Sequence, residues 1–209
     1  KEAANEKQSR VNQAVANEQK RFAEENDITL VDSDDQLSKN LEAANEMFSY
    51  YNDVYLVFFK SYLQEGYLIE AAGTGDMSAI EQNKSALESY AKEGREKLNE
   101  LGNFKGDLTL KTACLKLMGF YLDEATTKGK VMTDFFLEKE RFEKIAAAME
   151  GNKRPTQEEV DQYNEALESY NKLVDKFNAN NEALNKSRKK LLGDWNKAAN
   201  TFLSKHVTN

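Results

Sequence analysis

Proline, cysteine and histidine are almost absent from this chain of 209 residues, which has one of each, and glycine occurs only ten times. A sheet protein with many turns would need more glycine and proline, because these residues provide the backbone conformations of tight turns. The one cysteine, Cys114, cannot form an internal disulfide and lies in an apolar run, so we expect a small core residue. These absences favour a helical chain without a disulfide framework.

The scarcity of histidine and cysteine also excludes the common metal and catalytic sites. Di-iron centres of the ferritin type need Glu-x-x-His pairs, structural zinc sites need several Cys or His residues, and the sequence has neither pattern. His206 lies in a terminal segment that we expect to fray, where it would not support a catalytic triad. The turn Gly73–Gly75 lacks the lysine of a phosphate-binding loop. We therefore expect no cofactor, no metal and no catalytic residue, and we interpret the protein as a non-enzyme.

Charged residues make up 31% of the sequence and are interspersed, with a net charge of −7. An acidic surface repels phosphate, so we expect no nucleic-acid partner and no attraction to anionic membranes. The basic cluster Arg188–Lys190 is a single helical turn, which we interpret as a solvated helix face. The longest apolar run, Val54–Phe59, is too short to span a bilayer.

Five helical segments are predicted from the apolar periodicity and from residues that cap helices. They cover about residues 2–25, 35–72, 78–102 and 107–150, with a fifth that begins after Thr156. Oxygen side chains suited to helix N-termini occur at residues 32–35, at Asp107, and in the capping boxes Ser78–Glu81 and Thr156–Glu159. Gly129 predicts a bend in the fourth segment near residues 126–129.

The linkers between these segments are short, and no shift in composition marks a second domain. We therefore predict one domain over residues 1–209, in which the helix and linker of residues 1–31 are packed on the rest or partly detached from it. The predicted fold class is all-α: an elongated antiparallel bundle of four long helices plus an N-terminal helix.

The last segment has the longest regular apolar repeat in the chain. Its steps of three and four residues are those of a bundle seam, formed by Val160, Tyr163, Leu167, Tyr170, Val174, Phe177, Asn181, Leu184, Arg188, Leu191, Trp195, Ala198 and Phe202. Trp195 continues this repeat, so we predict that its ring is packed in the core. Asn181 and Arg188 are polar members of the seam, which either fix its register or mark where the bundle opens to water.

Seven aromatic residues lie between positions 48 and 62. The seam predicted for this second segment consists of Leu37, Leu41, Ala44, Phe48, Tyr51, Tyr55, Phe58 and Tyr62. A helix that is apolar nearly all round is either surrounded by other helices or leaves a surface for a partner. Both interpretations stay open, and the candidate binding surface consists of Tyr50, Tyr51, Tyr55, Phe58, Phe59 and Tyr62.

The end of the chain, from Leu184-Asn185-Lys186-Ser187-Arg188 through Trp195-Asn196-Lys197-Ala198 to Phe202–His206, resembles the tail of helical bacterial surface lipoproteins of unknown activity. The resemblance implies an exported bundle, on the outer surface or in the periplasm, that is held to the membrane only by a lipidated cysteine upstream of Lys1. It implies no catalytic motif.

These observations predict a non-enzymatic protein of the cell envelope that serves as an interaction or binding module, with another envelope protein or a small molecule as its partner. The alternative is an extracytoplasmic sensor that binds a small molecule between its helices. An enzyme of unfamiliar type is the third interpretation. An upstream lipidation site would favour the first and a flanking transmembrane helix the second.

Overall fold

The computed structural model describes residues 2–29 and 36–207, with side chains for residues 6–29 and 38–207. The described residues form six α-helices and one π-helical segment: α1 (Glu2–Glu25), α2 (Gln36–Thr74), α3 (Met77–Glu100), α4 (Thr109–Asp123), η1 (Glu124–Lys128), α5 (Gly129–Gly151) and α6 (Gln157–His206). The predicted all-α fold is confirmed. The predicted caps at residues 32–35 lie outside the described residues.

The chain divides into two compact units, Lys1–Ala43 and Ala44–Asn209. In the first unit, α1 is an amphipathic helix with the large apolar side chains of Val11, Val15 and Phe22 exposed. Its C-terminal end is closed by the amide of Ile28, which donates to the carbonyl of Ala23, and by Asp27 with φ of 56°.

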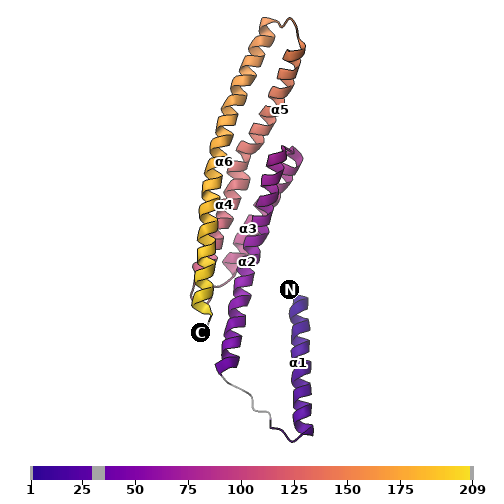
Figure 1. Cartoon of the computed structure of the whole chain (residues 1–209), viewed down its shortest axis with the longest axis vertical. Coiled ribbons are helices and arrows are strands. Elements are labelled where there is room, and N and C mark those ends of the chain that lie inside the picture. Colours follow the sequence, from indigo (N-terminus) through magenta and orange to yellow (C-terminus); the bar gives the residue numbers. More distant parts are fainter. Residues whose placement is uncertain (1, 30–35, 208–209) are drawn as a thin grey trace. The chain divides into compact units, whose positions relative to one another are not determined.

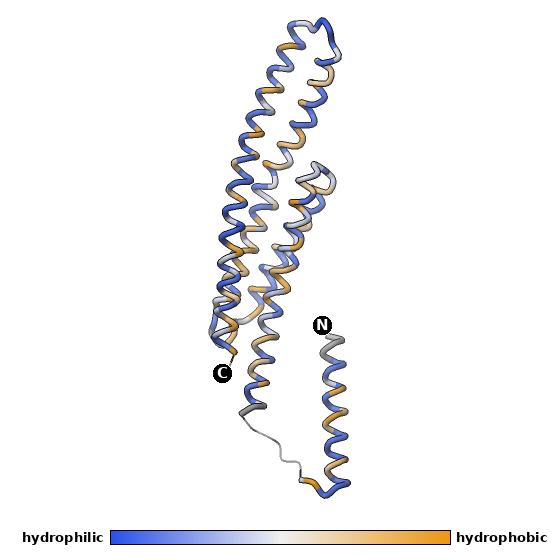
Figure 2. Tube along the Cα trace, viewed as in Figure 1, coloured by the Kyte–Doolittle hydropathy of each residue, from blue (hydrophilic) through white to orange (hydrophobic). Residues whose placement is uncertain are grey.

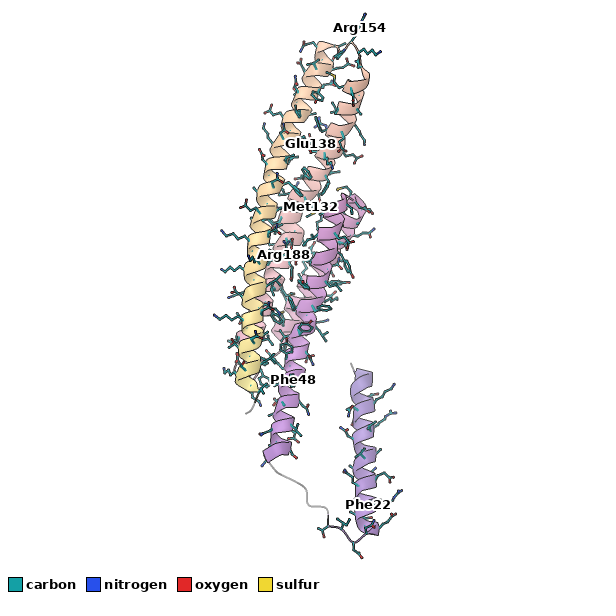
Figure 3. The ribbon with its side chains drawn as sticks, viewed as in Figure 1. Phe22, Phe48, Met132, Glu138, Arg154 and Arg188 are labelled. Carbon is teal, nitrogen blue, oxygen red and sulfur yellow. The ribbon has the colours of Figure 1, made fainter. Side chains whose placement is uncertain are left out.

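In the second unit, α6 runs antiparallel to α4 and α5 and packs along both, while α3 packs on α4 (Figure 1). Segments η1 and α5 continue α4 in one direction, and α2 and α3 form a hairpin at Gly75. The ring of Phe136, on α5, lies against Gly75. Beyond this point α5 and α6 continue as a two-helix hairpin that ends near Arg154, labelled in Figure 3.

Most of the predicted helix ends are close to the observed ones. Thr156 and Glu159 form the predicted capping box, and Gly75 follows the end of α2 with φ of 71°. The capping box predicted at Ser78 is wrong, because Asp76 accepts a hydrogen bond from the amide of Ala79 and the helix begins at Met77. The capping oxygen thus comes from Asp76, two residues before the predicted Ser78.

The irregularity predicted near residues 126–129 is a π-helical turn over Glu124–Lys128. Such turns insert one extra residue into a helix and are often found at functional sites. Here the turn rotates the side chains that follow relative to those of α4, and it places Glu124 and Ala125 in the interior. The Thr126 hydroxyl donates to the carbonyl of Leu122 and stabilises the turn.

The core of the second unit lies between α2, α3, α4 and α6, each of which alternates apolar and polar residues along its length (Figure 2). Its largest fully buried apolar side chains are Met47, Val54, Leu68, Ile80, Leu87, Leu98, Leu110, Leu117, Met118, Tyr121 and Phe202. Trp195 is only 3% exposed, so its predicted burial is confirmed. Asn180 is buried in place of the predicted Asn181, and its amide donates to the carbonyl of Lys128 at 3.3 Å.

The seam predicted for α2 is wrong in its rotation about the helix axis. The inward face is formed by Met47, Tyr50, Val54, Phe58, Ser61, Glu65 and Leu68. Three members of the predicted seam, Leu41, Phe48 and Tyr62, are exposed instead. The helix is apolar on nearly every side, so a regular spacing of apolar residues could be read in more than one register.

Candidate functional site: the outer face of helix α2

The six residues of the predicted binding surface do not lie on one face of α2. Tyr50 and Phe58 belong to the core, Tyr51 and Tyr55 are half-buried, and Phe59 and Tyr62 are exposed by 40% and 43%. The hydroxyl of Tyr50 donates to the carbonyl of Gly102 at 3.2 Å, and its ring stacks on Phe202. The predicted surface is therefore part core and part solvent-facing.

Most of the exposed large apolar side chains of the second unit lie on the other side of α2, which we call the outer face. It carries seven large apolar side chains that are each at least 40% exposed: Phe48, Leu56, Phe59, Tyr62, Leu63, Tyr67 and Ile69. Half-buried Tyr55 joins this face by stacking on Phe59, with ring centroids 5.7 Å apart. Phe48, near the start of the face, is labelled in Figure 3.

Sequence reasoning missed five of these residues, namely Phe48, Leu56, Leu63, Tyr67 and Ile69, because it assigned Phe48 to the core and passed over the rest. They could have been found from the number of apolar residues in α2, which is larger than one inward face can hold. Positions 56, 59, 63 and 67 repeat in steps of three and four, as on an amphipathic helix, but they lie away from the inward face.

A groove of about 530 Å³ runs beside the outer face, between α2 and α3. Leu56, Phe59 and Leu63 of α2 form its apolar wall. Lys60 reaches across to α3, where its ammonium lies 2.9 Å from Glu93 Oε2 and 3.8 Å from the ring centroid of Tyr90. The groove thus extends the apolar surface and adds one polar bridge to it.

A second candidate is a buried cluster of charges from three distant parts of the chain. Arg188 of α6, labelled in Figure 3, donates from Nε to Glu65 Oε1 at 2.5 Å and from Nη2 to Glu124 Oε1 at 2.6 Å. Glu65 and Glu124 are each 2% exposed. The prediction that Arg188 lies on a solvated face is wrong, because the π-helical turn and α2 bring two carboxylates to it.

The electrostatics of this charge cluster follow from its burial. Burial and the neighbouring Glu65 carboxylate raise the pKa of Glu124 to about 8, against the opposing effect of Arg188. Burial lowers the pKa of Arg188, but the two carboxylates outweigh it, so the net pKa lies above its ordinary value. Near neutral pH Glu124 is therefore mostly protonated.

Within the described residues, the Tyr121 hydroxyl is buried without a hydrogen-bond partner, which costs about 1–3 kcal/mol. Replacing buried ion pairs by apolar residues is often neutral or stabilising, so the charge cluster is better explained by register than by stability. It holds α6 at one position relative to α2 and η1.

A third group joins the loop between α3 and α4 to the C-terminal end of α6. Asp107 Oδ2 lies 2.9 Å from both Lys205 Nζ and His206 Nε2, and its Oδ1 accepts from the amide of Thr109. Burial raises the pKa of Asp107, but these hydrogen bonds outweigh it and hold the pKa well below its usual value. The expected fraying of the segment around His206 is wrong, since its ring also packs on Phe104 and Phe202.

The remaining reactive groups do not assemble into a centre in the described part of the chain. Burial raises the pKa of the Cys114 thiol to about 12, so it is not a nucleophile near neutral pH. Among the described residues there is no group of three His, Cys, Asp or Glu side chains that could hold a metal ion. None of the described helices is long and apolar enough to cross a membrane.

Comparison of this chain with protein-family models, with curated proteins and with solved structures found no match. Any inference about function therefore depends on the residues of this chain alone.

Proposed function

We propose that this chain is a non-enzymatic interaction module, in which a helical bundle presents the outer face of α2 to a helical partner. One observation carries the proposal: seven large apolar side chains of one helix are at least 40% exposed. Side chains of this size bury roughly 150–250 Å² each, so about half of that area, on the order of 700 Å² in total, is left in water. Soluble monomers rarely expose a contiguous apolar patch larger than a few hundred Å².

The shape of the surface favours a helix as the partner. The exposed side chains extend along α2 from Phe48 to Ile69, a distance of about 32 Å at 1.5 Å per residue. A partner helix lying along it would place apolar side chains at intervals of three and four residues against this row. A globular partner without such a helix would contact only part of it.

A location in the cell envelope, on the outer surface or in the periplasm, is the second part of the proposal. Its support is the resemblance of the segment Leu184–His206 to the tail of surface lipoproteins. An upstream lipid anchor would then be the attachment to the membrane. Fractionation of the natural host, followed by protease treatment of intact cells, tests this location, and recovery of the protein only in the cytoplasm would contradict it.

The interaction is tested with a photo-crosslinking amino acid placed at position 59 or 63 and irradiated in the cells that naturally make the protein. We expect covalent adducts with a polypeptide from both positions. Leu137 of α5, which is 54% exposed and apolar, provides a matched control position at which no adduct is expected. Absence of adducts from positions 59 and 63, or equal adducts from position 137, would contradict an interaction at the outer face.

A sensor that binds a small molecule is kept as a second proposal because of the groove between α2 and α3. Its volume of about 530 Å³ lies within the usual range for ligand sites, roughly 300–1,000 Å³. Lys60 and Glu93 would supply the polar contacts of such a ligand. Native mass spectrometry of protein purified from its host would support this function by showing a retained small molecule that a Leu63→Glu variant loses.

A further inference from the structure

The outer face of α2 has the spacing of a coiled-coil seam. Steps of four and three residues alternate without interruption through Phe48, Asn52, Tyr55, Phe59, Tyr62, Gly66 and Ile69. Tyr55 is half-buried and the other six positions are exposed. Because the inward face of α2 already packs in the bundle, the helix carries two seams, and a second helix would fit on the outer one.

We propose that the outer seam pairs with the outer seam of a second copy of this chain, as an antiparallel, two-fold symmetric dimer. This inference rests on the proposed function and names the partner. In an antiparallel pair whose two-fold axis passes near Phe59, Phe48 lies opposite Ile69 of the second copy, and Tyr55 lies opposite Tyr62. The order of residue types along the seam is thus self-complementary, as an interface with a two-fold axis requires.

The two positions of the seam that lack a large apolar side chain also fall opposite each other. Asn52 and Gly66 are equally far from Phe59, by seven residues in opposite directions. A Cβ built at Gly66 would meet nothing within 4 Å, so this position leaves open space beside the helix. The Asn52 side chain of the second copy would fit into that space, which explains why a small residue and a mid-sized polar residue interrupt the row at these places.

Charge and area both suit this pairing. The seam contains no charged residue from Phe48 to Ile69, so two copies that each carry a net charge of −7 would not place like charges against each other along it. A second copy that covered the whole outer face, including Leu56, Leu63 and Tyr67 beside the seam, would cover on the order of 700 Å² on each copy and bury about 1,400 Å² in total. Stable protein–protein interfaces bury about 1,200–2,000 Å².

Sedimentation velocity of the full chain across micromolar concentrations tests the dimer. We expect a species of twice the monomer mass of 23.8 kDa. A Phe59→Glu variant should raise the dissociation constant by about tenfold or more, because it places two carboxylates near the two-fold axis. Leu137→Glu introduces the same charge at an equally exposed apolar position and should leave the dimer unchanged, and circular dichroism checks that both variants fold.

Cysteine crosslinking tests the antiparallel register, since a disulfide needs Cα atoms within about 7 Å. Phe59→Cys should form a covalent dimer with itself, and a mixture of Tyr55→Cys and Tyr62→Cys should form a mixed dimer. Phe48→Cys should not crosslink to itself, because its two copies would lie about 32 Å apart. Crosslinking of Phe48→Cys with itself would overturn the antiparallel arrangement.

A chain that stays monomeric, or a dimer unaffected by Phe59→Glu, would overturn the pairing with a second copy. These outcomes can be told apart from failure of the proposed function by the adducts formed in cells. Adducts from position 59 with a different polypeptide would support the proposed interaction module, with a partner other than a second copy. Absence of any adduct would contradict the interaction itself.

Discussion

The indole of Trp195 stacks on the ring of Phe58, with centroids 4.6 Å apart and planes inclined by 30°. This contact joins the inward faces of α6 and α2 through two residues that are more than a hundred positions apart in the sequence. Both rings are buried, so the pair belongs to the main core of the bundle and not to its surface. The next residue of α2, Phe59, is exposed to solvent.

Replacement of Trp195 by alanine should lower the free energy of unfolding by about 3–5 kcal/mol, because it removes a large buried ring and leaves a cavity. Urea denaturation measures this change, and the exposed Lys197→Ala provides a control with little expected effect. The wild-type protein has one tryptophan, so its emission reports this site alone. Emission typical of a solvated indole, readily quenched by iodide, would show that the ring is not packed in the core in solution.

The burial of Trp195 could be predicted because α6 carries polar residues on its other faces, which leaves one apolar stripe and hence one register. The inward face of α2 could not be assigned in this way. Phe58 and Phe59 are adjacent, equally apolar residues, and only the neighbouring helices decide which one is buried. Sequence patterning therefore gave the helices and most of their ends, but it left the rotation of α2 undetermined.

The glycines of α3 and α4 provide a matched pair of substitutions. A Cβ at Gly94 would lie 2.8 Å from both Met118 Sδ and Val57 Cγ1, whereas a Cβ at Gly119 would meet nothing within 4 Å. Gly94→Ala should destabilise the protein by about 1–3 kcal/mol through overpacking, because the branched side chain of Val57 has little freedom to move. Gly119→Ala should stabilise it by up to about 1 kcal/mol, through helix propensity alone.

Thermal or urea unfolding of these two variants measures both effects in the same assay. Opposite signs are expected from the same chemical change in two neighbouring helices. If Gly94→Ala were as stable as Gly119→Ala, the close approach of α2, α3 and α4 at Gly94 would not exist in solution.

The charge cluster predicts a large effect for Arg188→Met. Removing the guanidinium leaves Glu65 and Glu124 buried without a cation, which should cost about 3–5 kcal/mol near neutral pH. The exposed neighbour Lys189→Met should have little effect. In a background with Glu65→Gln and Glu124→Gln, the further change Arg188→Met should cost much less, because no buried carboxylate loses its partner. Equal costs in both backgrounds would show that the three residues do not interact.

The charge cluster could not be predicted from the sequence, for a physical reason. Glu65, Glu124 and Arg188 are separated by about sixty residues each, and acidic pairs within one helix are common in a chain with 36 acidic residues. The one available signal was the position of Arg188 in the apolar seam of α6. Gly129 predicted a bend near the π-helical turn, but no residue pattern indicated that Glu124 would be buried there.

The raised pKa of Glu124 predicts how stability changes with pH. Its value of about 8, against an ordinary 4.5, is due to burial and to the neighbouring Glu65. Between these two pH values the folded protein keeps a proton that the unfolded chain has released, so the free energy of unfolding falls as pH rises. The contribution is complete below pH 4.5 and lost above pH 8, and at about 1.4 kcal/mol per pKa unit the loss is on the order of 3–5 kcal/mol.

A Glu124→Gln variant isolates this contribution, because its amide stays neutral at every pH while it still accepts a hydrogen bond from Arg188. Urea denaturation of both proteins should give similar free energies of unfolding at the acidic end of the window, whereas the variant should be the more stable protein above pH 8. Glu182→Gln, on the exposed surface of α6, serves as the control and should follow the wild type throughout. A constant difference between Glu124→Gln and the wild type across the whole range would mean that Glu124 does not keep its proton in the folded state.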